Sequence, residues 1–354
     1  MAKNIYLCSL RERVGKTLLS IGIMQKLQKL GKSYAYFKPI GIPKSAFSAK
    51  ADPDVGFILD TVYKTDYPYH LISPVSIPDC YYVDLIDANQ KEENLKKIKD
   101  AYDKISADVD YVVIEGAPTI KKFIRVGIDD LTIAKTIGPK ELVYIEKESS
   151  DKCIDNLFFT KKYFDFRNYT MKGVLFNRID YDYLARIDEL AENHIKRYEI
   201  PILGRVEQKL EFIAARVSEV KEAIGGELIN ESAISGMDNM VETYLIGAMN
   251  TQAALKYLRQ AKRAACITGG DRSDLLLASL NEDVSCLILT GFIQPDVKVI
   301  TAANEKNVPI ILSPSDTYTT LRNLERLRPG LQRDEVDEVL KLVDDSIDWD
   351  KLLA

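Results

Sequence analysis

Short apolar runs alternate with longer segments of helical spacing along the first 200 or so residues. The run Asn4–Cys8 predicts a buried strand, and Thr17–Leu30 predicts a helix that ends at Gly31, because glycine often terminates helices. Strands that alternate with helices favour parallel pairing, so we expect an α/β fold with a doubly wound, mostly parallel sheet. Further strands are predicted at 34–37, 111–114, 142–145 and 173–176, and further helices at 92–105 and 183–198.

The alternation pauses near 201–208 and changes character after Arg216. Shorter apolar runs then predict the strands of a second, smaller α/β domain, at 244–248, 264–268, 285–290 and 309–312. Near the end, apolar residues at helical spacing between 334 and 343 predict an amphipathic helix. We interpret this helix as packed on its own domain rather than as a peptide that binds a partner. The expected organisation is a first domain at 1–210, a second at 215–328 and a helical tail at 329–354.

Composition narrows the class of protein. The 354 residues are 46% hydrophobic and 29% charged, which is typical of a globular chain, and the net charge is -5. A negative net charge gives no general attraction to nucleic acid or anionic lipid. No apolar stretch is long enough to span a bilayer and no signal peptide precedes the first strand, so we expect a cytoplasmic protein. Five cysteines without a CxxC pair, and only two histidines, argue against a zinc site or a disulfide framework.

The most informative motif is Gly15-Lys16-Thr17, which follows a predicted strand and opens a predicted helix. In this context glycine lets the backbone approach a phosphate, and the helix N-terminus favours an anion. The lysine would neutralise phosphate oxygens, and the threonine hydroxyl would bind Mg²⁺. The sequence therefore predicts an ATP site with Mg²⁺. Its expected nucleotide-binding residues are Arg11, Arg13, Val14, Gly15, Lys16, Thr17 and Leu18.

The motif is incomplete, because Leu10 stands where the usual P-loop pattern has its first glycine. A chance sequence at an ordinary helix start is the competing interpretation, and agreement between strand, loop, motif and helix disfavours it. Arg11 and Arg13 have two open interpretations: charges over the phosphates, or solvated loop charges.

Charged residues also follow two other predicted strands. Glu115 ends the run at 111–114, and Lys38 follows the strand at 34–37. Because ligands of open parallel sheets bind at the carboxyl ends of strands, both side chains should reach the phosphate site. Asp52 and Asp54 lie shortly after Lys38. We predict Thr17, Asp54 and Glu115 as metal ligands, and Lys16, Lys38 and Glu115 as the residues that would carry chemistry.

Taken together, six short motifs resemble dethiobiotin synthetase and its relatives, which include cobyrinic acid a,c-diamide synthases and the N-terminal domain of long phosphotransacetylases. The resemblance covers about the first 208 residues. It implies that the lysines hold phosphate and substrate carboxyl groups, that Thr17, Asp54 and Glu115 bind Mg²⁺, and that Asn177 reads the adenine edge. The motifs are Val14–Thr17, Tyr36–Ile40, Asp52 with Asp54, Val113–Ala117, Gly173–Arg178 and Pro201–Gly204.

Two departures place the chain nearer the phosphotransacetylase branch. The glycine-rich start is replaced by Ser9–Arg13, and Pro118-Thr119 replaces the glycine pair of dethiobiotin synthetase. Residues 241–324 resemble a DRTGG domain, most specifically in the run Ile267–Asp274. The chain ends at Ala354, before an acyltransferase domain would fit, so we do not expect a complete acetyl-phosphate-forming enzyme.

The glycine-rich run of the second domain predicts a strand, a Gly-Gly turn and a helix that Asp271 or Ser273 could cap. Arg272 beside a helix N-terminus could bind an anion, or it could be solvated or paired with Asp271. Both interpretations remain open for the candidate ligand site Gly269, Gly270, Asp271, Arg272 and Ser273.

Three functions compete at this point. The first is a nucleotide-dependent regulator, with a homo-oligomeric assembly and a metabolic enzyme as expected partners. The second is an ATP-dependent ligase that activates a small carboxylate as an acyl phosphate. The third is an assembly module that has lost turnover, which the retained Gly15-Lys16-Thr17 and Glu115 disfavour.

Overall fold

The computed structural model describes residues 2–43, 52–61, 63–78, 82, 90–208, 214–327 and 333–354. The chain forms two compact units, one of residues 1–208 with 333–354 and one of residues 209–332. Residues 209–213 and 328–332 lie outside the described residues, and with them most of the stretch between the predicted domains at 1–210 and 215–328. Residues from Arg333 onward, predicted as a tail behind the second domain, belong to the first unit.

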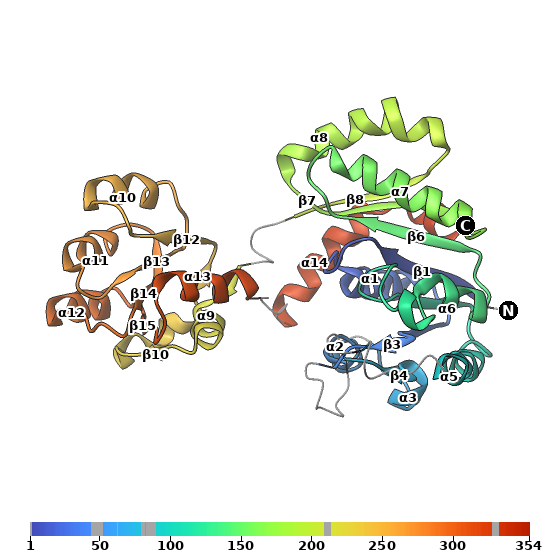
Figure 1. The fold of residues 1–354 in the computed structure, drawn as a ribbon, viewed down its shortest axis with the longest axis horizontal. Coiled ribbons are helices and arrows are strands. Elements are labelled where there is room, and N and C mark those ends of the chain that lie inside the picture. The colour runs from blue at the N-terminus through green and yellow to red at the C-terminus, as the bar shows by residue number, and fades with distance from the viewer. Residues whose placement is uncertain are drawn as a thin grey trace. The chain divides into compact units, whose positions relative to one another are not determined.

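A six-stranded parallel sheet forms the centre of the first unit within its described residues, in the order β2-β5-β1-β6-β7-β8. The central strand β1 (Lys3–Ser9) is buried from Ile5 onward, because helices cover both faces of the sheet (Figure 1). The other strands are β2 (Tyr34–Phe37), β5 (Tyr111–Glu115), β6 (Glu141–Glu146), β7 (Thr170–Ile179) and β8 (Ile202–Glu207), with a small β3 (Ile40–Gly41) and β4 (Val75–Ser76) pair beside them.

The strand order reverses at β1, which lies between β5 and β6. The expected doubly wound, mostly parallel fold is therefore confirmed, and the loop after β1 lies at a switch point where such sheets bind ligands. The helices of this unit are α1 (Lys16–Lys29), α2 (Pro53–Thr61), α3 (Tyr69–Ile72), α5 (Lys91–Ile105), α6 (Asp130–Ile137), α7 (Lys152–Phe166), α8 (Tyr181–Leu190), α14 (Arg333–Ser346) and α15 (Trp349–Leu353), with short turns at Ile124–Val126, Ala191–Ile195 and Lys196–Tyr198.

Two expectations for this unit need correction. The pause near 201–208 is an edge strand, β8, whose apolar run is broken by Gly204 and Arg205. The helix predicted at 183–198 is α-helical only to Leu190, after which it continues as a π-helical and then a 3₁₀ turn. Periodicity alone does not distinguish these tighter and wider turns from an α-helix.

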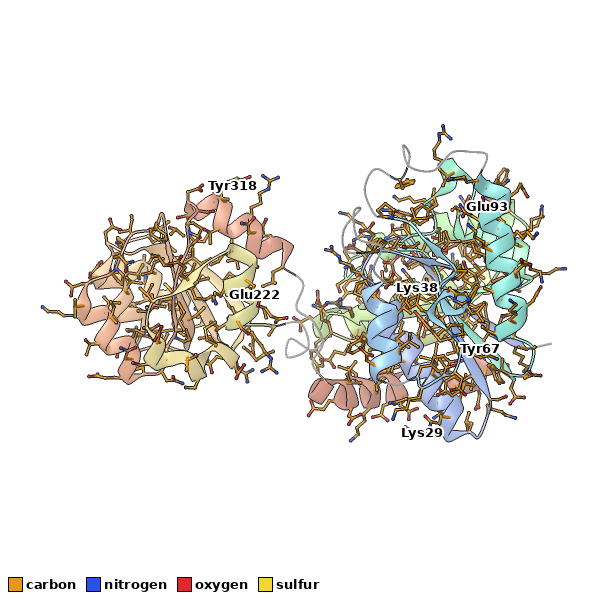
Figure 2. All side chains as sticks on the ribbon, turned by 90° about the horizontal axis from the view of Figure 1, so that it is seen from below. Lys29, Lys38, Tyr67, Glu93, Glu222 and Tyr318 are labelled. Carbon is orange, nitrogen blue, oxygen red and sulfur yellow. The ribbon has the colours of Figure 1, made fainter. Side chains whose placement is uncertain are left out.

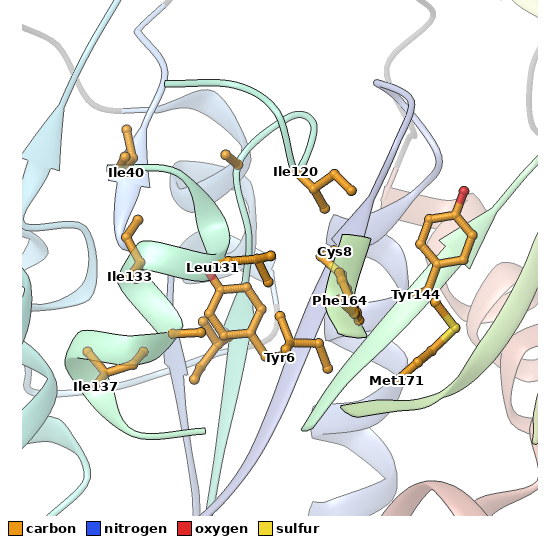
Figure 3. Close-up of a cluster of buried hydrophobic side chains, with 14 of the residues drawn as sticks. Tyr6, Cys8, Ile40, Ile120, Leu131, Ile133, Ile137, Tyr144, Phe164 and Met171 are labelled. Atoms are coloured by element: carbon orange, nitrogen blue, oxygen red, sulfur yellow. The ribbon is translucent and has the colours of Figure 1, made fainter. Parts of the chain in front are cut away.

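The core of the first unit lies between the sheet and its helices. Tyr6 on β1 points toward helix α6, which carries Leu131, Ile133 and Ile137, and all four side chains are buried (Figure 3). On helix α1, a Cβ at Gly22 would lie 2.6 Å from Cγ1 of Val343 on α14. Helix α14 therefore completes the packing of this unit at a position where only glycine fits.

The second unit contains a sheet with the order β10-β15-β14-β13-β12 within its described residues, parallel except for the edge strand β10. The second, smaller α/β domain is thus confirmed in fold. Its strands are β9 (Ala215–Arg216), β10 (Glu227–Leu228), β11 (Met240–Val241), β12 (Thr243–Ile246), β13 (Ala264–Gly269), β14 (Val284–Thr290) and β15 (Ile310–Leu312). Its helices are α9 (Val217–Ile224), a 3₁₀ segment (Glu231–Asp238), α10 (Thr251–Leu258), α11 (Ser273–Ser279), α12 (Val297–Glu305) and α13 (Thr317–Arg326).

Candidate functional site

The loop between β1 and α1 has the backbone of a phosphate-binding turn. Gly15 precedes α1 with a φ of 86°, in the left-handed region that glycine occupies without strain. Asn177, on β7, donates a 2.6 Å hydrogen bond from Nδ2 to the carbonyl of Val14. A Cβ at Gly15 would lie 2.4 Å from that same Nδ2. Glycine is therefore required here twice, by its φ and by the amide that lies against it.

Lys16 is buried beneath this loop. Its Nζ donates to the hydroxyl of Ser9, at 2.9 Å, and to the carbonyl of Pro118, at 3.0 Å. Burial lowers the pKa of Lys16, and the carboxylates of Glu115 and Asp130 partly oppose this effect. A phosphate group beside the loop would give the ammonium a full counter-charge, which the two neutral oxygens do not supply.

The second lysine, Lys38, lies in the interior of the first unit, whereas Lys29 lies at its surface (Figure 2). Burial lowers the pKa of Lys38, but the surrounding carboxylates outweigh burial and raise the pKa above its usual value. The distances from its Nζ are 2.9 Å to Asp52, 3.1 Å to Asp54 and 3.3 Å to Glu115.

Glu115 joins the lysine cluster to the phosphate loop. Its Oε1 accepts a 3.1 Å hydrogen bond from the hydroxyl of Thr17, and its Oε2 accepts a 2.9 Å bond from the buried phenol of Tyr36. Burial raises the pKa of Glu115, while Lys38 acts in the opposite direction. Motif analysis missed Tyr36 as a positioning residue, although it stands two residues before Lys38 on β2.

Asp52 and Asp54 have different surroundings. Asp52 is buried and accepts hydrogen bonds from the backbone N–H groups of Ile42, at 2.6 Å, and Asp54, at 2.8 Å. It therefore connects the start of α2 to the residue that follows β3. The side chain of Asp54, the predicted metal ligand, is 55% exposed and contacts Lys38 from the solvent side. The structure brings both carboxylates to the same ammonium group.

The two arginines of the loop between β1 and α1 have different surroundings. Arg11 forms a 2.5 Å ion pair with Glu148, which follows β6. Arg13 has a φ of 57°, and its carbonyl lies 3.4 Å from Nη1 of Arg178. Of the remaining predicted residues, Val14 is buried and Leu18 is half-buried on α1.

A buried carboxyl group near the phosphate loop was not predicted. Asp130, at the start of α6, accepts hydrogen bonds from the N–H of Ala117, at 2.8 Å, and the phenol of Tyr6, at 3.1 Å. Its Oδ2 has no hydrogen-bond partner among the described residues. Burial raises the pKa of Asp130 to about 7. No sequence pattern pointed to this group, because Asp129-Asp130 is typical of a helix cap, which Asp129 provides.

The donor set fits a magnesium ion held with nucleotide. Mg²⁺ prefers oxygen ligands and commonly uses one or two carboxylates together with substrate phosphates. The Thr17 hydroxyl and the Glu115 carboxylate are in contact, and Asp54 approaches through Lys38. Among the described residues, no group of three or more His, Cys, Asp or Glu side chains is arranged to hold a metal. Thr17 and Glu115 would hold the ion, and phosphate oxygens would complete its coordination.

In the second unit, the glycine-rich run at the end of β13 allows two backbone segments to pack closely. A Cβ at Gly270 would lie 1.9 Å from the carbonyl oxygen of Ile293, so the turn after β13 presses on the loop after β14. A Cβ at Gly269 would lie 2.5 Å from Oδ1 of Asp271. Ser273 begins α11, but Arg272 occupies the N-cap position without a side-chain cap bond, so the capping expected from Asp271 or Ser273 is wrong.

Arg272 is engaged with backbone rather than with Asp271. Its guanidinium donates to the carbonyls of Gly247, at 3.2 Å, and Met249, at 2.9 Å, and lies 3.7 Å from Asp274. The arginine therefore ties the loop after β12 to the start of α11. The sequence left open whether Arg272 binds an anion. To do so, its guanidinium would have to give up its hydrogen bonds to these backbone carbonyls.

Two protein-family models match the chain. A family model described as AAA domain matches residues 3–216. The chain belongs to this AAA domain family. A DRTGG domain model matches residues 219–327 of the chain, so the resemblance expected for both parts of the sequence is confirmed. No helix among the described residues is both long and apolar enough to cross a membrane.

Curated relatives of this chain include phosphate acetyltransferases. The enzyme of Synechocystis sp. is 24% identical over 100% of this chain and 52% of its own length. The enzyme of Nitratidesulfovibrio vulgaris is 25% identical over 99% and 51%, and that of Escherichia coli is 22% identical over 97% and 51%. The chain thus spans about half the length of these relatives.

Solved structures similar to this chain each cover part of it. The CBS and DRTGG domains of Clostridium perfringens pyrophosphatase, complexed with diadenosine tetraphosphate, cover 43% of this chain and 71% of theirs, with 19% identity and a TM-score of 0.30. MinD of Pyrococcus horikoshii with Mg-ADP covers 60% and 84%, with 14% identity and a TM-score of 0.37. Cobyrinic acid a,c-diamide synthase of Mycobacterium smegmatis with ADP and magnesium covers 59% and 88%, with 16% identity and a TM-score of 0.36.

Proposed function

We propose that the first unit binds ATP together with Mg²⁺, and that the chain is a nucleotide-dependent regulator of a metabolic enzyme. The observation that carries the proposal is the pair of buried lysines at the carboxyl edge of the sheet. Lys16 begins α1 directly after the turn that Gly15 makes possible, and Lys38, which follows β2, lies 3.3 Å from Glu115. Buried cations at a helix N-terminus favour a polyphosphate anion.

Each residue has a distinct role in this proposal. The loop amides and Lys16 neutralise the phosphate chain. Thr17 and Glu115 hold Mg²⁺, which spreads the negative charge of the phosphates. Tyr36 keeps the Glu115 carboxylate oriented, and Lys38 prevents the neighbouring carboxylates from repelling the nucleotide.

The segment after Glu115 favours regulation over ligase chemistry. Dethiobiotin synthetase, by resemblance, has glycines where this chain has Pro118 and Thr119. The carbonyl of Pro118 accepts a hydrogen bond from Lys16, and Thr119 is buried. By the resemblance, these two residues stand where the glycines of dethiobiotin synthetase shape the substrate side of the site. We therefore expect slow ATP hydrolysis that diamino and dicarboxylic acids do not stimulate.

The proposal is tested by titration calorimetry of ATP, ADP and GTP, each with and without Mg²⁺. Lys16→Ala should weaken Mg-ATP binding at least about 10-fold, because a charge-assisted hydrogen bond contributes about 1.5–3 kcal/mol. Lys32→Ala, which removes an exposed lysine of the same unit, is the matched control and should bind as the wild type. Equal affinity in wild type and Lys16→Ala would contradict the site.

Regulation requires that nucleotide changes the second unit. Hydrogen exchange at residues 269–274 should differ with and without Mg-ATP in the wild type and not in Lys16→Ala. Strong stimulation of phosphate release by a small carboxylate, with unchanged exchange at 269–274, would instead favour the ligase.

A further inference from the structure

Helix α7 carries an exposed stripe that the nucleotide site does not use. The stripe runs along one face at helical spacing, and its two phenylalanines are 60% exposed at Phe159 and 81% exposed at Phe166. The opposite face of the same helix is buried at Cys153, Leu157 and Phe164, against the core beside β6 and β7 (Figure 1). The stripe consists of Lys152, Asp155, Phe159, Lys162 and Phe166, all of them exposed.

The charges of the stripe differ from the other charges on and around this helix. Neighbouring groups are paired: Lys161 with Asp165, Asp151 with Arg186, and Arg167 with Asp129. Within the described residues, by contrast, none of the three stripe charges has an ion-pair or hydrogen-bond partner. The stripe therefore combines exposed aromatic surface with available charges of both signs.

The positions of these residues are symmetric about the middle of the helix. Phe159 lies midway between Lys152 and Phe166, the first and last residues of α7. Asp155 precedes Phe159 by about 6 Å along the axis, and Lys162 follows it by about 4.5 Å. An antiparallel copy crossing at Phe159 would consequently place Asp155 beside Lys162 of the other helix, and Lys152 beside Phe166.

We propose that α7 forms an isologous contact between two copies of this chain, with their α7 helices antiparallel and crossing at Phe159. A two-fold contact of this kind requires a self-complementary surface. The central phenylalanines pack on each other, two equivalent Asp155–Lys162 pairs flank them, and Lys152 lies over the Phe166 ring in a cation–π contact. A parallel arrangement would set each charge beside its own copy, so the charge pattern selects the antiparallel one.

The stripe is small, which sets the expected strength. Stable dimers bury about 800 Å² per partner, and one face of a 15-residue helix offers less. We therefore expect a weak dimer whose population rises with protein concentration through the micromolar range.

Sedimentation velocity of the full chain over a range of concentrations tests this contact. The wild type should show a monomer–dimer equilibrium, and Phe159→Glu should weaken association at least about 10-fold. Tyr257→Glu, which changes an exposed aromatic side chain on α10, is the matched control and should leave association unchanged. A wild type that stays monomeric at the highest concentration, or one whose association survives Phe159→Glu, would overturn the proposal.

Charge exchange tests the antiparallel register. Asp155→Lys and Lys162→Asp should each weaken the dimer, and the double variant should restore it, because the pair is re-formed with its signs reversed. These surface positions have no partner among the described residues of their own chain, so circular dichroism should be the same for all variants. Two weakened single variants without recovery in the double variant would overturn the register.

Discussion

The two sheets of this protein end in carboxyl edges of opposite character. In the first unit that edge carries buried charges, among them Lys16, Lys38 and Glu115. In the second unit, hydroxyls at the corresponding edge form neutral hydrogen-bonded pairs. Thr290 lies 2.9 Å from Thr317, and Ser313 lies 2.8 Å from Thr320, measured between hydroxyl oxygens.

This difference sets a cluster of buried charges against neutral hydroxyl pairs, on two sheets of similar architecture. Buried charges are costly unless they are paired, so a cluster of them is maintained where a ligand makes use of it. Neutral hydroxyl pairs and glycine contacts complete a fold without any ligand. The stability of the first edge should therefore depend on cations, anions and pH. The stability of the second should depend mainly on substitutions that change the size or shape of a side chain.

The largest effect is expected from Lys38→Met. This change leaves three carboxylates without their shared ammonium, and breaking a buried ion pair from one side costs about 3–5 kcal/mol of unfolding free energy. Added Mg²⁺ should recover part of the loss, since it can bind the freed oxygens. Urea unfolding with and without Mg²⁺ measures both effects.

Lys29→Met is the control for that experiment, because it removes an exposed lysine that pairs with Asp344. It should cost less than about 1 kcal/mol and show no response to Mg²⁺. If both lysine variants lost the same small amount, the first edge would not be a charged site.

The second unit should be most sensitive at Gly270. An added methyl group at this position meets the carbonyl of Ile293 at 1.9 Å, and backbone cannot yield as a side-chain tip can. Gly270→Ala should lower the free energy of unfolding by about 1–3 kcal/mol. Gly56→Ala, in α2 with no described atom within 4 Å, should instead stabilise by about 0.5–1 kcal/mol. A neutral Gly270→Ala would show that this turn is not tightly packed.

Asp130 should make stability depend on pH. Its pKa is raised from 3.8 to about 7 by burial, so between these values the folded chain keeps a proton that the unfolded chain has lost. The stabilisation from this group is complete below pH 4 and is lost as the pH rises to 7, with a slope of up to about 1.4 kcal/mol per pH unit. In Asp130→Asn this slope should disappear, and urea unfolding from pH 5 to 8 compares the two proteins. Parallel pH profiles would exclude a raised pKa.

The smallest effect belongs to the hydroxyl edge. Thr290→Val removes one hydroxyl of a neutral pair and preserves shape, so it should cost about 1 kcal/mol. Mg-ATP affinity should not change. A loss of nucleotide binding in this variant would show that the second edge contributes to nucleotide binding, which its neutral hydroxyl pairs do not indicate.

The sequence predicted which charged residues of the first unit lie near one another, because these residues follow strands directly. Gly15, Lys16, Lys38 and Glu115 each lie at a strand end or helix start, where topology alone brings them together. The site's other components depend on tertiary contacts. Asp130 reaches Ala117 only because α6 packs on β1, and Lys16 bonds to Pro118 through a carbonyl that no side-chain pattern encodes. In the second unit, the sequence at Gly270 predicted a turn. The structure shows that this glycine also leaves room for the backbone carbonyl of Ile293.

The return of α14 to the first unit has a consequence for the order of biosynthesis. Residues 333–354 leave the ribosome after the whole second unit, yet Val343 fills the niche at Gly22, and the carbonyl of Ser346 would lie 2.6 Å from a Cβ at Gly204. During translation the second unit can thus fold while the apolar surface of α1 is still uncovered. Until α14 and α15 are synthesised and pack, chaperones can bind this apolar surface, or the surface can associate incorrectly. Slow translation of the second unit therefore prolongs the time during which the first unit exposes it.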